Sequence, residues 1–357
     1  MERLGARDQP SPQWLLGAVS QSGMGRRGVH FPVGVGGRAP RGIEPVHRSQ
    51  LVGLEVVGGG CDLALQLHRG RLLWCQHAVG LVSHQPDRGS TGMGAQAVSF
   101  GDRLQAKWHR QLARHLDRDL RPLTGSMPVI SFTFDDAPQS AFERGGDIVR
   151  AEGGSATYFC SLGLLGAQTE VGRMASLQHL QRAIHQGHEL GCHTYDHLDG
   201  WRTAQETFMH SIEKNALAFK TLLGVEPPLH FAYPKSGARW PLKRAVSRRF
   251  VTCRGGAESL NAKVADLHLL KACFLDQRAG WPLDDLRALI DLNRRQCGWL
   301  IFATHDVDPK PTAFGCTPQR LKEVVQHAAQ SGALLCTMTQ ACQAMNLIDV
   351  TGAGGRN

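Results

Sequence analysis

Short runs of apolar residues alternate with amphipathic stretches in the chain after Gly125. The apolar runs predict strands, and the stretches with apolar residues at every third or fourth position predict helices. The predicted strands are residues 129–134, 157–162, 189–193, 229–233, 250–253, 267–275, 299–304 and 333–337. The predicted helices are residues 138–151, 170–186, 204–223, 242–249, 283–295 and 318–330. Strands and helices in alternation are typical of a parallel α/β architecture.

About seven parallel strands in this pattern are compatible with closure into a (β/α) barrel, similar to a TIM barrel. In such a barrel the functional residues lie at the carboxyl ends of the strands, because the loops there form one face. Asp135, His193, Tyr233 and His305 all stand at such ends. Their positions favour an active site on that face.

The first 92 residues differ in composition from the rest of the chain. They hold 17 of the 41 glycines and no lysine, and they show neither helical nor clear strand periodicity. Such a composition buries too little apolar surface to offset its ordering entropy. One interpretation is a flexible accessory segment. The other, which we favour, is a true start downstream at Met93, with the upstream residues translated from non-coding sequence.

Charge and hydropathy exclude some classes of function. The formal net charge is +9, but residues 93–357 hold 30 Lys and Arg against 25 Asp and Glu, a small excess for that length. Nucleic-acid binding is therefore not predicted. No window approaches about 18 consecutive apolar residues, so no membrane span is predicted. The N-terminus mixes acids with its arginines and lacks the pattern of a secretory signal. Ten cysteines without such a signal predict reduced thiols and a cytoplasmic location.

Two adjacent carboxylates, Asp135 and Asp136, follow directly after the predicted strand 129–134. Neighbouring acids that leave an apolar strand repel each other and lose hydration, unless a cation or a proton donor lies between them. This pair therefore predicts a metal site.

His193 and His197 are four residues apart, and on one helical turn they would lie on the same face and bind one metal ion. With the acid pair they form a set of two histidines and one carboxylate, plus a spare acid. Three protein ligands leave positions for water and substrate, which is typical of a hydrolytic site. Zinc is the default ion for these ligands, and manganese, cobalt and nickel remain alternatives.

Four segments, in this order, resemble the signature motifs of the polysaccharide deacetylases, the NodB-homology group of metal-dependent carbohydrate esterases (carbohydrate esterase family 4). The segments are Thr133–Asp136, His193–His197, Phe231–Pro234 and Ile301–His305. Four ordered motifs at strand ends make the resemblance specific, and it covers about residues 127–345. On this basis residues 127–345 are the predicted catalytic domain. Residues 93–126 are predicted to form an amphipathic helix and a linker, and residues 346–357 a flexible tail.

The resemblance implies a distorted (β/α) barrel of about seven parallel strands, and it implies a role for each residue of the motifs. Asp135 would be the general base and His305 the general acid. The backbone N–H of Lys235 would stabilise the oxyanion. The implied metal ligands are Asp136, His193 and His197.

Further residues near the motifs have roles that are implied in the same way. Asp276 would orient His305. Tyr233 and Pro234 belong to the third motif, and Tyr195 and Trp201 could line a sugar subsite because aromatic faces suit carbohydrate rings, although both could equally be packing residues.

The sequence departs from the family pattern at three places. Ala137 stands where glycine usually follows the two acids, and Lys235 stands where an aromatic residue is common. The arginine that often begins the third motif is absent, with Leu229 or His230 near its place. The partner that orients Asp135 is therefore not identified from the sequence.

These observations predict a metal-dependent hydrolase of a non-peptide carbon–nitrogen bond, with N-deacetylation of an amino sugar or polysaccharide as the leading interpretation. Two alternatives stay open: a hydrolase of a small non-sugar amide with the same fold, and a catalytically inactive carbohydrate-binding homologue. The predicted partner is an N-acetylated carbohydrate or another small amide.

Overall fold

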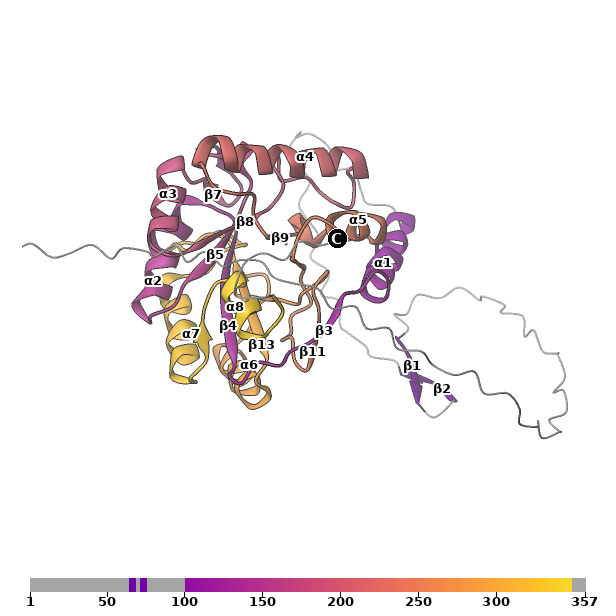
Figure 1. Cartoon of the computed structure of the whole chain (residues 1–357). Coiled ribbons are helices and arrows are strands. Elements are labelled where there is room, and N and C mark those ends of the chain that lie inside the picture. Colours follow the sequence, from indigo (N-terminus) through magenta and orange to yellow (C-terminus); the bar gives the residue numbers. More distant parts are fainter. Residues whose placement is uncertain (1–63, 69–70, 76–99, 349–357) are drawn as a thin grey trace, which may run out of the picture. The chain divides into compact units, whose positions relative to one another are not determined.

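The structure is a computed structural model (Figure 1), and it describes residues 64–68, 71–75 and 100–348. The chain divides into two compact units, residues 1–91 and 92–357. In the first unit, β1 (Ala64–His68) and β2 (Arg71–Cys75) pair as an antiparallel hairpin. The predictions made for the segment 1–92 and for the tail 346–357 concern residues that lie almost entirely outside the described part, and they stay predictions.

The second unit is built around a parallel sheet. Its main path has seven strands in the order β10-β9-β8-β5-β4-β13-β12, and β14 pairs with the start of β4. The strands are β4 (Val129–Asp136), β5 (Ala156–Cys160), β8 (Glu189–Cys192), β9 (His230–Ala232), β10 (Thr252–Arg254), β12 (Cys273–Phe274), β13 (Trp299–Thr304) and β14 (Leu334–Leu335). The predicted α/β fold with about seven parallel strands is confirmed.

Backbone hydrogen bonds connect the two ends of this path. The N–H of Leu270 donates to the carbonyl of Cys253 (2.8 Å), and the N–H of Gly255 donates to the carbonyl of Leu270 (3.0 Å). These bonds join β10 to the segment that leads into β12. The sheet therefore curves into a distorted barrel, as the sequence predicted.

Helices and helical turns make most of the connections between the strands. The helices are α1 (Phe100–His115), α2 (Gly146–Ala151), α3 (Leu177–His185), α4 (Gln205–Ala218), α5 (Trp240–Val246), α6 (Leu283–Gln296), α7 (Pro318–Gln330) and α8 (Met338–Ala344). In Figure 1, α2, α3 and α7 lie along one side of the sheet. No helix in the described ranges has the length and apolar content that a bilayer span requires.

Two short antiparallel ribbons complete the unit. One consists of β3 (Leu120–Pro122) and β11 (Val264–Asp266), and the other of β6 (Gln168–Thr169) and β7 (Gly172–Arg173). Turns of π-helix precede α2 (Ala141–Gly145) and follow α4 (Phe219–Leu223). Turns of 3-10 helix cover Leu162–Leu164 and Pro234–Ser236.

Two predicted elements differ most in extent from those observed. The helix predicted over residues 170–186 begins only at Leu177, because Gly172 has φ of 100°, which a helix does not allow, and turns the chain into the β6–β7 ribbon. The strand predicted over residues 267–275 shortens to β12, because the residues before it bond to β10 through isolated contacts. Helix α8, which we did not predict, begins at a capping box formed by Thr337 and Gln340.

Every residue of β4 is buried, from Val129 to Asp136. The strand is flanked by β13 on one side and β5 on the other, and the rings of Phe134 and Tyr158 stack with centroids 5.0 Å apart. Asp135 and Asp136 therefore leave the centre of the sheet, where their charges need specific partners.

Protonation of His188 is expected to destabilise the protein in mild acid. The side chain is 6% exposed, and its Nδ1 accepts a hydrogen bond from the backbone N–H of Ala156 (3.0 Å). Burial, with a contribution from Arg150, lowers the pKa of His188 from 6.5 to about 4. Between these values the unfolded chain binds more protons than the folded protein, so the free energy of unfolding should fall, by at most about 3 kcal/mol, as the pH drops through this range.

Urea unfolding at a series of pH values between 4 and 7 tests this expectation. The dependence on pH should be weaker in His188→Gln, and it should keep its wild-type size in His185→Gln, which changes a nearby exposed histidine. Equal slopes for the wild type and both variants would show that His188 does not titrate in this way.

Candidate functional site

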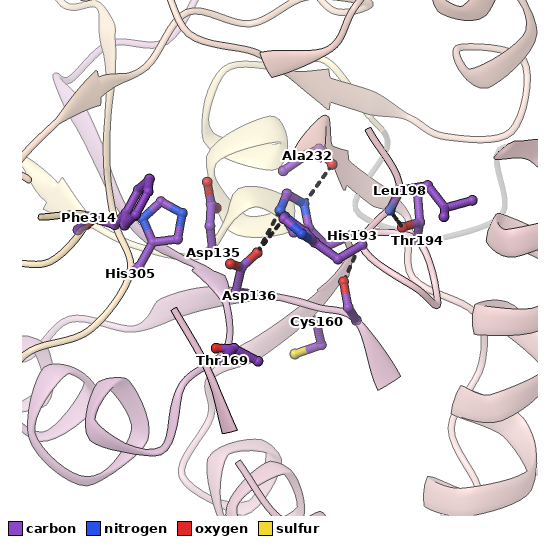
Figure 2. Close-up of polar contacts among 12 residues, drawn as sticks. Asp135, Asp136, Cys160, Thr169, His193, Thr194, Leu198, Ala232, His305 and Phe314 are labelled. Carbon is purple, nitrogen blue, oxygen red and sulfur yellow. Dashed lines mark hydrogen bonds and ion pairs between the residues drawn. The ribbon is translucent and has the colours of Figure 1, made fainter. Parts of the chain in front are cut away.

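The carboxyl ends of β4 and β8 bring the three predicted metal ligands together, and Figure 2 shows Asp136 and His193 facing each other. Asp136 Oδ1 lies 3.2 Å from His193 Nε2 and 3.0 Å from His197 Nε2. One ligand atom from each residue lies within 4.8 Å of the others. Three donors this close can hold a single ion.

The surroundings of these residues fit a metal ion. His193 Nδ1 lies 2.8 Å from the carbonyl oxygen of Ala232 and donates to it, so the lone pair of Nε2 faces Asp136. Asp136 Oδ1 is buried, and no donor in the described part of the chain is aligned on it. Burial raises the pKa of the Asp136 carboxyl, but the imidazoles of His193 and His197 lower it well below its usual value. A divalent cation would satisfy this ionised oxygen, and the two nitrogens and one oxygen suit zinc.

His193 and His197 do not share a helical turn, so that part of the prediction is wrong. His193 follows β8 directly, whereas Thr194 and His197 have φ values of 62° and 51°, which turn the chain back. Thr194 Oγ1 accepts a hydrogen bond from the N–H of Leu198 (3.1 Å) and closes this turn. The two imidazole rings still lie 5.1 Å apart. The spacing of four residues brings them together through a left-handed turn.

Left-handed backbone is concentrated at the site. Six non-glycine residues with positive φ belong to it: Asp136, Ala137, Thr194, His197, Lys235 and Ser236. Each costs on the order of 1 kcal/mol, which the surrounding structure must offset. Ala137 has φ of 65°, which explains why glycine would be the unstrained residue at this position.

Asp135 is held by an arginine that the sequence did not predict. Arg254, the last residue of β10, donates a hydrogen bond from Nη2 to Asp135 Oδ1, and its side chain is 2% exposed. Burial raises the pKa of Asp135, but the charges of Arg254, His193 and His305 outweigh that effect and lower it. Asp135 is therefore ionised and fixed in orientation.

Arg254 lies on β10, one strand further along the chain than the predicted position of the arginine. The family pattern places an arginine near Leu229 and His230, at the amino end of β9. The register pairs Arg254 with Ala232, at the carboxyl end of β9. His230 is occupied elsewhere, since its ring nitrogens bond to the hydroxyls of Thr252 and Thr339. The arginine thus comes from the next strand, at the end where the site lies.

His305 follows β13 directly and is oriented by a backbone carbonyl. Its Nδ1 lies 3.0 Å from the carbonyl oxygen of Phe314, to which it donates, so Nε2 remains available for proton transfer. The prediction that Asp276 orients His305 is not supported. The carboxylate of Asp276 instead accepts hydrogen bonds from Arg278 (2.9 Å) and from the N–H of Ala279 (2.8 Å).

The backbone of Lys235 has a free donor. Lys235 has φ of 54° in the turn after Pro234, and its N–H finds no hydrogen-bond acceptor among residues 100–348. Lys235 also lines the cavity that contains the predicted metal ligands. These features suit the role of oxyanion donor, which stays a prediction.

A cavity of about 1100 Å³ lies over these residues. Its walls include Asp135, Asp136, His193, His197, Tyr233, Lys235 and His305. Of the four residues predicted to bind substrate, Tyr233 lines the cavity, whereas Pro234 is buried and does not. Tyr195 is also absent from its walls and packs under the ammonium group of Lys214, 4.0 Å from the ring centroid. Trp201 does not line the cavity either. Its ring centroid lies 5.5 Å from the guanidinium of Arg110, which does line it.

The fold and the site together define a class of protein. It is an α/β barrel in which two histidines and one aspartate meet at the carboxyl ends of the strands. A further aspartate, Asp135, and a further histidine, His305, lie beside them. Within this class, residues 123–248 match the family described as polysaccharide deacetylase. This match confirms the resemblance drawn from the sequence. A bifunctional xylanase/deacetylase from Pseudobutyrivibrio xylanivorans is 32% identical over 103 residues, which are 29% of this chain and 16% of that protein.

Several solved structures are similar to this chain. The Xyl-CE4 domain of a multidomain xylanase from the hindgut metagenome of Trinervitermes trinervoides is 19% identical, with a TM-score of 0.43 over 61% of this chain and 91% of that one. The peptidoglycan deacetylase PdaC from Bacillus subtilis is 19% identical, with a TM-score of 0.40 over 62% and 93%. A family 4 acetyl xylan esterase from Clostridium thermocellum, solved with cobalt, is 20% identical, with a TM-score of 0.43 over 60% and 90%.

Proposed function

We propose that this protein is a metal-dependent hydrolase that removes the acetyl group from the nitrogen of an amino sugar or a polysaccharide. The observation that carries this proposal is the gathering, in one cavity, of a three-ligand centre and two separately oriented proton-transfer groups, Asp135 and His305. The family match over residues 123–248 supports the same class of reaction. A cavity of about 1100 Å³ has room for a sugar chain, which favours a carbohydrate over a small amide.

The roles follow from what each group can donate or accept. A divalent ion held by Asp136, His193 and His197 would supply a Lewis acid and would lower the pKa of water. Asp135 is ionised beside Arg254, so it accepts a proton from the attacking water. The N–H of Lys235 donates to the acetamide oxygen as negative charge develops there.

His305 acts on the leaving group. An amide nitrogen leaves poorly as an anion, so a proton must reach it as the carbon–nitrogen bond breaks. The carbonyl of Phe314 holds Nδ1, which leaves Nε2 to deliver that proton. The base and the acid are thus oriented by different partners, Arg254 and Phe314.

Loss of one imidazole is expected to abolish metal binding. His193→Ala removes one of three ligands, so the affinity for zinc should fall by more than about a hundredfold. Metal content after dialysis, measured by atomic emission, should be about one zinc per chain in the wild type and near zero in this variant. His210→Ala, which removes an exposed histidine of α4, should keep the metal.

Acetate release from chitin oligomers tests the reaction itself. The zinc-loaded wild type should release acetate, and His193→Ala should not. A wild-type protein that holds no divalent metal, or that releases acetate no faster than His193→Ala from chitin oligomers and from anionic N-acetylated sugars alike, would overturn the proposed function.

A further inference from the structure

One wall of the cavity carries a row of cations. Arg110 and Arg114 on α1, and Arg118 just after it, all line the cavity. Arg110 and Arg114 are exposed and four residues apart, which places their side chains on one face of α1. Arg118 is exposed in the segment that follows the end of the helix. Lys235 and Lys271 add two exposed ammonium groups to the same cavity.

Most acids of the cavity are already engaged by other groups. Asp266 receives the ammonium of Lys243 at 2.8 Å, and Lys243 is completely buried. Asp135 and Asp276 pair with Arg254 and Arg278. The charges of these three acids are therefore compensated by specific partners rather than by the cations of the row.

Two further carboxylates line the cavity. Glu258 accepts hydrogen bonds from the indole of Trp281 (2.9 Å) and from the N–H of Phe274 (3.2 Å). Glu170, at the β6–β7 turn, has no ion pair with another described residue. Glu258 has no ion pair in the described part of the chain either, because both of its donors are neutral. Beside the predicted metal ligand Asp136, these two glutamates are the lining carboxylates that no cation of the described residues pairs with, against four unpaired cations.

The cations of the wall have no such partners. Arg110, Arg114, Lys235 and Lys271 form no ion pair with any residue of the described part of the chain. Arg118 reaches Asp266 only at 4.0 Å, and that carboxylate already binds Lys243. Charges of one sign along a cleft with low-dielectric walls attract ligands of the opposite sign.

Lys235 connects this row to the reacting centre. Its N–H is the proposed donor to the acetamide oxygen, and its ammonium stands in the same cavity on a flexible stem. A charged group on the sugar that carries the acetamide, or on its neighbour, would therefore lie within reach of a cation.

We propose that the substrate is an N-acetylated amino sugar that carries a negatively charged group, a phosphate or a carboxylate, bound by this basic wall. The proposal rests on the proposed function for the identity of the acetylated sugar. A neutral chitin chain offers these four unpaired cations no counter-charge. An anionic sugar offers one, and arginine suits both phosphate and carboxylate oxygens.

Binding to the full-length protein gives the deciding measurement. Calorimetry would compare N-acetylglucosamine, N-acetylglucosamine 6-phosphate and N-acetylmuramic acid, before and after removal of zinc with a chelator. Measurement without zinc excludes direct binding of the anion to the metal. At about 50 mM salt at least one charged sugar should bind about tenfold more tightly than the neutral sugar, and this preference should shrink at about 500 mM salt because the charges are screened. The sugar that binds more tightly identifies the group as phosphate or carboxylate.

Two variants test whether the cations of the basic wall cause the preference for the charged sugar. Arg114→Gln should weaken the binding of the charged sugar about tenfold, whereas Arg295→Gln, an exposed change on α6 away from the cavity, should not alter it. If the metal-free protein binds charged and neutral sugars equally, the inference is overturned, whatever the catalytic result.

Acetate release by the zinc-loaded protein separates this inference from the proposed function. Charge-dependent binding without acetate release from any of the three sugars or from chitin oligomers would keep the basic subsite and reject the deacetylase. Acetate release at equal efficiency from all three, with equal binding, would keep the deacetylase and reject the charged substrate.

Discussion

Replacement of Asp135 by asparagine is expected to lower the rate of acetate release about a thousandfold while the metal stays bound. The amide has nearly the shape of the carboxylate but cannot accept the proton of the attacking water. Asp135 is also not one of the three ligands, whose donor atoms come from Asp136, His193 and His197. The loss should appear in kcat more than in KM, because the proton moves only in the transition state.

Steady-state acetate release and zinc content measured on the same preparation test this separation of roles. Asp285→Asn, an exposed change on α6, serves as the matched control and should behave like the wild type. If Asp135→Asn loses its zinc, or keeps more than about a tenth of the activity, Asp135 is not the general base.

Replacement of Arg254 by methionine is expected to destabilise the protein by about 3 kcal/mol and to shift its pH–rate profile. Arg254 is almost completely buried, and its loss leaves the Asp135 carboxylate without the partner that holds its charge. In the variant, burial still raises the pKa of Asp135, and only the charges of His193 and His305 remain to lower it. The acid limb of the profile should therefore move to higher pH, and activity at neutral pH should fall about a hundredfold.

Substitution of Asp135 together with Arg254 shows whether the loss of stability comes from the interaction between these two residues. In the double variant Arg254→Met with Asp135→Asn neither charge remains, so urea unfolding should show a smaller loss of stability than the sum of the two single variants. Arg248→Met, at an exposed arginine just before β10, is the control for the change of residue type. Additive losses, or an acid limb that does not move, would exclude a functional pairing of Arg254 with Asp135.

The regular elements of the barrel could be predicted where local signals agree. Strand β13 and helix α7 have the predicted bounds, Trp299–Thr304 and Pro318–Gln330. An unbroken apolar run defines the strand, and Thr317 with Pro318 marks the start of the helix through a side-chain cap on Arg320 N. Such signals are local, so the sequence alone contains them.

The partner of Asp135 could not be predicted in the same way. Arg254 lies 119 residues further along the chain, and in the order of the sheet three strands separate β10 from β4. Curvature of the sheet brings the two strand ends to the same cavity, and apolar periodicity carries no information on that curvature. The turn that joins His193 to His197 was missed for a related reason, since Thr194 adopts a left-handed conformation that its residue type does not indicate.

The left-handed residues of the site have a consequence for attempts to engineer this protein. Selection for heat resistance alone would favour glycine at Asp136, Thr194 or His197, because glycine relieves backbone strain at positive φ. Each of these changes would delete a proposed metal ligand or the hydroxyl that closes the turn between two of them. A more thermostable descendant obtained without selection for activity is therefore expected to be a well-folded barrel that has lost the proposed metal site.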